Sequence, residues 1–130
     1  MDIFIRLNIE YFDMFPKEKR ISSELFKEVY ADGAHIDGQY VYAKVLHTGT
    51  SLDSCFGVVV PQSTVAQSAH RSRVKRRITH ALKQCVDQLD TGYAMVVFAK
   101  EDIRGTENEK IQHDIQNLLE KVVENGKSVH

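Results

Sequence analysis

The sequence predicts a small α/β (α+β) sandwich of two layers, with helices packed on one short sheet. Three observations support this fold class. Alternating β-rich segments and one continuous apolar run predict strands, and apolar residues spaced by three or four predict amphipathic helices. The order along the chain is α-β-β-α-β-α, with one more short strand expected near residues 34–36. The length of 130 residues fits one domain with a single modest core.

The composition is that of an ordinary soluble globular protein, with 42% hydrophobic and 27% charged residues. The net charge of −1 argues against a protein that coats nucleic acid with its whole surface. The N-terminus lacks the apolar run of about 7–15 residues that a secretory signal needs. No segment approaches the roughly 20 apolar residues that span a bilayer. We therefore expect a cytoplasmic protein with no membrane partner, in which Cys55 and Cys85 are buried free thiols.

Residues 1–14 are expected to be an N-terminal extension that the core does not need, before one domain over residues 15–130. Two interpretations of this stretch remain. The alternation of Ile3, Ile5, Leu7 and Ile9 docks on the domain as a short strand or helical turn, or the chain starts at Met14.

The first helix is predicted over residues 22–33, with Ser22 as its N-cap and Gly33 as a left-handed stop. Strands follow at residues 39–47 and 55–60, the second ended by Pro61. Within the helix, Phe26 and Tyr30 have two readings. They pack in the core, or they line a cleft in which bases stack.

A long helix over about residues 68–89 carries five Lys/Arg within the seven residues 71–77. From Ser54 to Val86 there is no Asp or Glu, and the cations of this stretch sum to +6. At about 100° per residue, one side is an apolar stripe of Val74, Ile78, Leu82, Cys85 and Leu89. The opposite side carries Arg73, Arg76, Arg77, His80 and Lys83. Solvated faces normally mix charge signs, so this face predicts an anion-binding surface.

The last strand is predicted at residues 93–99, a continuous apolar run typical of a strand buried on both faces. A capping box at residues 106–109 opens the last helix, and Asn125-Gly126 is expected to end it. Its inner face is Ile111, Ile115, Leu118, Leu119 and Val122. The acids that balance the basic helix lie mostly here: Glu107, Glu109, Asp114, Glu120 and Glu124.

No pattern of catalytic chemistry stands out in the chain. It lacks a nucleophile elbow, a Gly-rich phosphate loop and a zinc-protease motif, and its six histidines are scattered. We therefore expect no catalytic residues and no metal site in the protein. What the chain offers is binding, through Arg side chains suited to phosphates and nearby aromatic rings.

The basic segment at residues 71–78 resembles the Arg-Asn-Arg-x-Lys-Arg motif of the bacterial ribonuclease P protein subunit. Two further matches lie in the right order. Phe15-Pro16-Lys17-Glu18-Lys19-Arg20-Ile21 is similar to the Leu-Pro-Lys-Glu-x-Arg-Leu opening of that family. Residues 26–33 are similar to its Phe-x-x-Val-Phe-x-x-Gly. With Gly38 and the strands, the resemblance covers about residues 15–123.

The resemblance implies an α-β-β-β-α-β-α fold like that of ribosomal protein domains, with a left-handed crossover around the basic helix. It implies an accessory subunit of a ribonucleoprotein endonuclease, a hydrolase that removes the 5′ leader of precursor tRNA. Its partners would be ribonuclease P RNA and precursor tRNA, with no stable protein partner. The chemistry would belong to the RNA and its Mg²⁺, the protein binding no cofactor. The RNA-binding set would be Arg71, Ser72, Arg73, Lys75, Arg76, Arg77, His80 and Lys83, and the leader cleft Phe26, Tyr30, Tyr42 and Phe56.

Departures from the family pattern support an alternative. Ser72 replaces the family's Asn, and residues 62–66 lack the usual Lys-Lys-x-Gly. The family is also strongly basic, whereas this chain is not. The alternative is a non-enzymatic RNA-binding or ribosome-associated module of the same fold without a role in tRNA processing. A purely protein-binding domain ranks third, because nothing identifies an acidic partner for the acid-free segment.

Overall fold

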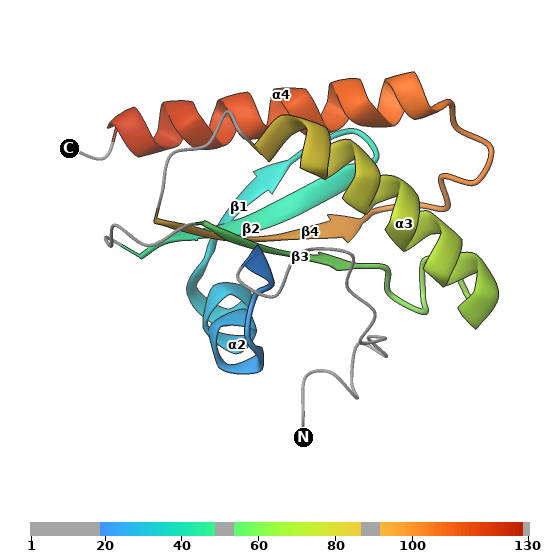
Figure 1. Ribbon diagram of the computed structural model, residues 1–130, viewed down its shortest axis with the longest axis horizontal. Coiled ribbons are helices and arrows are strands. Elements are labelled where there is room, and N and C mark those ends of the chain that lie inside the picture. The colour runs from blue at the N-terminus through green and yellow to red at the C-terminus, as the bar shows by residue number, and fades with distance from the viewer. Residues whose placement is uncertain (1–18, 49–53, 87–91, 129–130) are drawn as a thin grey trace.

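The computed structural model describes residues 19–48, 54–86 and 92–128 (Figure 1). The expected extension over residues 1–14 and the stripe residue Leu89 lie outside the described residues. The elements follow the order α-β-β-β-α-β-α implied by the resemblance. They are α2 (Ser23–Asp32), β1 (Ala34–Asp37), β2 (Val41–His47), β3 (Cys55–Val59), α3 (Ser68–Cys85), β4 (Tyr93–Ala99) and α4 (Asn108–Ser128).

The described strands form one four-stranded sheet in the order β1-β2-β4-β3. β2 pairs antiparallel with both β1 and β4, and β3 pairs parallel with β4. Parallel neighbours need a crossover connection, and α3 supplies it between β3 and β4. β4 is therefore a central strand, and its residues from Ala94 onward are buried. This confirms the prediction from its continuous apolar run.

Helices cover both faces of this sheet (Figure 1). α3 and α4 lie together on one face, and their apolar side chains join Phe56, Val58 and Met95 in the larger core cluster. α2 lies on the opposite face, where Phe26 and Val29 pack with Phe98 in a smaller cluster. The sheet with α3 and α4 forms the predicted sandwich, and the short α2 adds partial cover on the other side.

The ends of α2 agree with the sequence at one terminus and differ at the other. Ser22 is the N-cap, and its hydroxyl accepts a hydrogen bond from the Leu25 N–H at 3.2 Å, as predicted. The left-handed stop at Gly33 is wrong, because its φ is −67°. Glycine is needed there for a different reason. A Cβ at this position would overlap the Val29 carbonyl oxygen, which accepts the Gly33 N–H.

Both predicted ends of α4 are also corrected. A cap at Thr106 would start the helix at Glu107. The helix instead begins at Asn108, because the Glu107 carbonyl accepts the first helical N–H groups. It continues through Asn125-Gly126 to Ser128. A glycine inside a helix costs only about 1 kcal/mol, so two weak helix formers do not have to end it.

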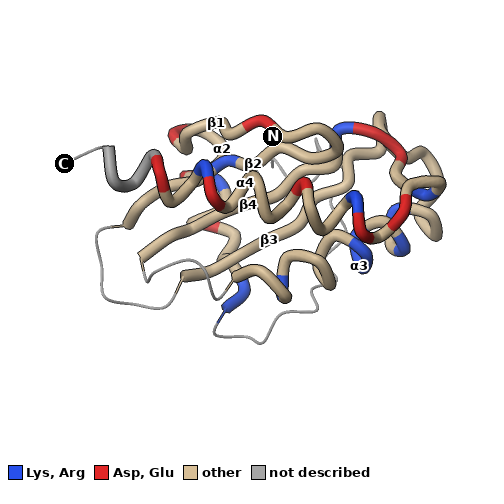
Figure 2. Tube along the Cα trace, turned by 90° about the horizontal axis from the view of Figure 1, so that it is seen from above, with Lys and Arg blue, Asp and Glu red and all other residues tan. Residues whose placement is uncertain are grey.

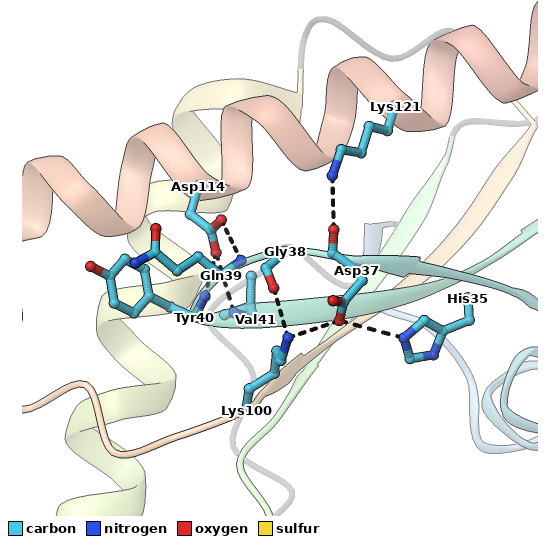
Figure 3. A network of polar contacts seen from close by, with 9 residues as sticks. All are labelled: His35, Asp37, Gly38, Gln39, Tyr40, Val41, Lys100, Asp114 and Lys121. Atoms are coloured by element: carbon cyan, nitrogen blue, oxygen red, sulfur yellow. Dashed lines mark hydrogen bonds and ion pairs between the residues drawn. The ribbon is translucent and has the colours of Figure 1, made fainter.

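A carboxylate on α4 fixes the turn between β1 and β2 (Figure 3). Asp114 is only 8% exposed and accepts the backbone N–H groups of Gln39 and Tyr40, each at 2.8 Å, and of Val41 at 3.2 Å. The sequence predicted that this strand begins at Gln39. It begins at Val41, because the bonds to Asp114 hold Gln39 and Tyr40 in the turn. A Cβ at Gly38 would lie 2.6 Å from the Val41 carbonyl oxygen, so this turn needs glycine.

Replacing Asp114 by Ala is expected to lower the free energy of unfolding by about 3 kcal/mol. The change leaves three backbone donors without their shared acceptor, and loss of a buried hydrogen-bonding partner costs about 1–3 kcal/mol. Urea denaturation measures the loss. Asp114→Asn, which keeps one acceptor oxygen, is expected to lose less, and equal losses for both variants would contradict this account.

Candidate nucleic-acid interface

The long helix α3 has the two-sided character that its sequence predicts. Val74, Ile78 and Leu82 are 0% exposed, and Cys85 is 3% exposed. Cys55 and Cys85 are both free thiols, with Cys55 only half-buried, and burial raises the pKa of each. The buried stripe fixes the rotation of the helix about its axis. The remaining side chains therefore point to defined places.

The side of α3 away from the core carries exposed cations. Arg73, Arg76, His80 and Lys83 are exposed and form what we call the α3 outer surface. Among the described residues, Arg73 and Arg76 have no hydrogen-bond or ion-pair partner. Figure 2 shows Lys and Arg along α3, whereas Asp and Glu lie on other elements, α4 among them. Within the α3 outer surface, Arg73 and Arg76 thus present uncompensated positive charge to solvent.

Arg71 does not belong to that surface, although the resemblance places it in the RNA-binding set. It is only 7% exposed. Its Nη1 donates to the carbonyl oxygens of Val65 at 3.1 Å and Ala66 at 2.6 Å. The guanidinium therefore holds the loop that leads into α3, and it is directed away from solvent because the apolar stripe rotates this position toward the protein.

The predicted place of Arg77 on the exposed side of the helix is also corrected. Its guanidinium turns toward the segment before α4. Nε donates to Asn108 Oδ1 at 2.9 Å, Nη1 donates to the Ile103 carbonyl at 2.6 Å, and Nη2 donates to the Thr106 carbonyl. The side chain joins α3 to the start of α4. Its acceptors in these bonds are all neutral, so its positive charge is not cancelled by them.

Ser72 and Lys75, the other two members of the predicted set, are half-buried. The Lys75 carbonyl accepts the Thr79 hydroxyl at 2.7 Å within the helix. The two residues flank Arg73 and Arg76 on α3 without sharing their full exposure. Of the eight predicted RNA-binding residues, the structure brings four to the outer surface and directs Arg71 and Arg77 elsewhere.

Arg104 adds a cation that sequence reasoning missed. Its Nη1 is hydrogen-bonded to His70 Nδ1 at the start of α3, and its Nη2 forms an ion pair with Asp102 at 2.5 Å. The hydrogen bond from Arg104 lowers the pKa of Asp102, so this acid stays charged and offsets Arg104. A basic residue 33 positions after Arg71 gives no sequence signal that it meets α3.

Aromatic rings form a stack across three strands on the α2 face of the sheet. Tyr42 on β2 is in register with Phe98 on β4, and their rings stack at 4.8 Å. His35 on β1 stacks on the other side of Tyr42 at 4.7 Å. Phe26 and Tyr30 of α2 lie against Phe98 at 6.4 and 6.0 Å. The structure thus brings together three of the four predicted cleft residues.

Phe56 is the predicted cleft residue that does not join this stack. It belongs to the core cluster on the α3 and α4 face and is 2% exposed. Side chains alternate between the faces of a strand, so Phe56 points opposite to Cys55, which lies on the α2 face. Its place as a cleft residue is therefore corrected to a core position. Phe26, at 3% exposed, is likewise mainly a core residue.

The exposed part of the aromatic stack combines rings with a cation. Lys44 lies over the Tyr30 ring at 4.3 Å and donates to the Tyr30 carbonyl at 2.8 Å. Burial, and then the neighbouring Tyr30, raises the pKa of Tyr42, so its phenol stays neutral at physiological pH. His35 is 53% exposed at the end of the stack. His35, Phe98 and Lys44 were missed because the sequence alone does not give the strand register.

The aromatic stack and the α3 outer surface lie on different faces of the sheet, and the edge strand β3 connects to α3. Val59 of the edge strand β3 is in register with Phe98. Only residues 60–67 separate that strand from α3. The chain therefore passes from the strand beside Phe98 to the start of α3 through an eight-residue connection.

Comparison with known proteins agrees with this architecture. The model of the Ribonuclease P family matches residues 15–123. The ribonuclease P protein component of Picosynechococcus sp. is 26% identical over 105 residues, which is 80% of this chain and 90% of that protein. The RNase P protein of Staphylococcus aureus has a TM-score of 0.68 at 17% identity, covering 82% and 96% of the two chains. That of Thermotoga maritima has a TM-score of 0.67 at 17% identity, covering 78% and 96%.

The fold and the basic crossover helix define a protein of the ribonuclease P class. Because the family model spans most of the sequence, the chain belongs to the Ribonuclease P protein family. Within the described residues, His, Cys, Asp and Glu form no group of three or more that could hold a metal ion. The same part of the chain contains no helix with the length and apolarity to cross a membrane.

Arg71→Ala and Arg77→Ala are each expected to lower the free energy of unfolding by about 1–3 kcal/mol. Each change leaves two or more buried or half-buried carbonyl acceptors without a donor. Arg73→Ala, which removes an exposed side chain of the same type, is expected to stay within about 0.5 kcal/mol of wild type. Urea denaturation of the three variants measures the difference. Equal stability of all three would contradict the assignment of Arg71 and Arg77 to the fold.

Proposed function

We propose that this protein binds ribonuclease P RNA through the α3 outer surface and assists removal of the 5′ leader from precursor tRNA. The catalytic chemistry belongs to the RNA and Mg²⁺, and the protein contributes binding. The observation that carries the proposal is the exposed, unpartnered pair Arg73 and Arg76 on a helix segment without acids. Guanidinium groups bind phosphates by paired hydrogen bonds, which suits them to an RNA backbone.

Membership of the family supports the partner named in this proposal. The Picosynechococcus relative is a ribonuclease P protein component, and the match covers 90% of its length. The motif residues that the structure exposes, Arg73 and Arg76, are also those whose charge is most available to an external anion. The geometry therefore supports the part of the resemblance that concerns Arg73 and Arg76.

The leader is proposed to contact the exposed part of the aromatic stack. Single-stranded RNA binds proteins through stacking of its bases on aromatic rings and through cations along its backbone. His35, Tyr42 and Lys44 offer both on one sheet face. A leader that follows the edge of β3 would connect this face with the start of α3.

Adding the protein to the catalytic RNA of the same organism at low Mg²⁺ is expected to increase leader cleavage. Arg73→Ala combined with Arg76→Ala is expected to weaken RNA binding and remove much of this gain. Each lost phosphate contact should reduce the salt slope of binding by about 0.7–0.9, so the pair should reduce it by about 1.4–1.8. Filter binding over a salt series and single-turnover cleavage measure the two effects.

Lys121→Ala is a suitable control, because it removes an exposed cation on α4, away from α3. The Lys121 Nζ donates to the Asp37 carbonyl at 3.0 Å. The substitution should leave the salt slope unchanged. Failure of the wild-type protein to increase cleavage would refute the tRNA-processing role. RNA binding without any gain in cleavage would favour the alternative of an RNA-binding or ribosome-associated module, which the missing Lys-Lys-x-Gly stretch motivates.

His35→Ala is expected to lower the preference of the assembled enzyme for precursor over mature tRNA by about fivefold or more. The change removes the exposed ring of the stack, and a stacked base is worth about 1–3 kcal/mol. Competition between precursor and mature tRNA measures the preference. His47→Ala is the matched control, since His47 is also exposed and contacts an aromatic ring, that of Tyr93 at 4.9 Å. A similar loss in both variants would contradict a leader contact at His35.

A further inference from the structure

A groove of about 330 Å³ lies between α3 and α4, and it extends from residues that the family resemblance places in RNA contact to residues of α4 that the resemblance does not include. Its volume falls within the roughly 300–1,000 Å³ of small-molecule sites. Only Ala81 of its lining is apolar. The lining residues are Arg76, Arg77, His80, Ala81, Gln84, Asn108 and Gln112.

Helical spacing brings these side chains into two parallel rows. Arg76, His80 and Gln84 are four residues apart along α3 and span about 12 Å at 1.5 Å per residue. Asn108 and Gln112 have the same spacing on α4. The two helices pack together through their apolar sides, and Arg77 in the middle of α3 donates to Asn108 at the start of α4. The groove is therefore formed by rigid elements.

The charge of the groove favours an anion. Its lining contains no Asp or Glu but includes two guanidinium groups. Arg76 has no partner among the described residues, and the acceptors of Arg77 are neutral. Two positive charges without an opposing carboxylate make this groove a favourable place for a phosphate.

The carboxamides of the groove add hydrogen-bond donors and acceptors, which could recognise more of a ligand than an anionic group alone. Asn108 Oδ1 accepts from Arg77 Nε, which leaves the Asn108 N–H groups as donors. The Gln84 amide nitrogen is bonded to His80 Nε2 at 2.9 Å, which leaves the Gln84 carbonyl oxygen as an acceptor. In the described part of the chain, Gln112 has no hydrogen-bond partner. Donors and an acceptor beside a cation match the edge of a nucleobase or a ribose hydroxyl.

We propose that the α3–α4 groove binds a nucleotide unit of ribonuclease P RNA, with its phosphate at Arg76 and its base edge or 2′-hydroxyl at Gln84, Asn108 and Gln112. The inference rests on the proposed function, because the ligand is a continuation of the RNA bound by the α3 outer surface. Arg76 and His80 belong to both the surface and the groove. An RNA strand that lies along the α3 outer surface would therefore enter the groove directly, because the two share residues.

The test replaces the two flexible carboxamides by Met in the full chain, as Gln84→Met combined with Gln112→Met. Met has nearly the helix propensity and length of Gln but cannot form these hydrogen bonds. Affinity for ribonuclease P RNA of the same organism is expected to fall about tenfold, as two lost hydrogen bonds predict. The salt slope is expected to stay unchanged, because carboxamides displace no counterions. Filter binding over a salt series measures both quantities, and circular dichroism confirms that the variant is folded.

Gln116→Met is the matched control, because Gln116 is exposed on α4 one turn beyond Gln112 and outside the groove lining. It is expected to bind as wild type. A photoreactive side chain at position 112 is expected to crosslink to the RNA, and one at position 116 is not. Unchanged affinity of the double variant, or an equal loss in Gln116→Met, would overturn the groove proposal while wild-type binding upholds the proposed function. Absence of wild-type RNA binding would overturn both.

Discussion

The arrangement of α3 depends on burial of one apolar stripe. Val74, Ile78 and Leu82 are removed from solvent against the sheet and α4, and each such burial contributes about 1.5–3 kcal/mol. This contact fixes how the helix is rotated, and rotation decides which cations meet water. Guanidinium groups alone would not hold a helix in one orientation, because exposed polar contacts are worth little. The core therefore determines the binding surface.

The basic segment divides into residues whose side chains bond within the fold and residues whose side chains face solvent. Arg71 directs its guanidinium group to backbone carbonyls of the loop before α3, and Arg77 directs its own to backbone carbonyls of the segment before α4. Arg73 and Arg76, from the same short run, remain exposed. Arg suits both tasks because its planar group forms several hydrogen bonds and keeps its charge while doing so. A motif match treats these residues alike, and only the geometry separates them.

Local patterns predicted most of the fold, and long-range pairing set the rest. The Ser22 cap, the β4 bounds and the α3 stripe follow from periodicity and short-range chemistry, so the sequence contained them. The geometry at Gly33 was mispredicted because a close approach of two segments, and not a left-handed turn, requires glycine there. The sequence predicted that the candidate site combines cations with aromatic rings, but it did not predict correctly which residues form the site. Phe56 was misplaced and His35 was missed because strand register, which decides faces and neighbours, is a property of the sheet.

The distribution of charge has a consequence for how this protein meets a polyanion. Acids gather around the β1–β2 turn and the middle of α4, at Asp37, Asp114, Glu120 and Glu124, whereas α3 carries cations without acids. The net charge is only −1, so the uneven placement of charges matters more for long-range attraction than their sum. Beyond a Debye length of about 8 Å, an RNA exerts little net pull on the molecule. Under the proposed function, attraction would begin only once α3 faces the RNA, which would slow random encounters and disfavour indiscriminate binding to other nucleic acids.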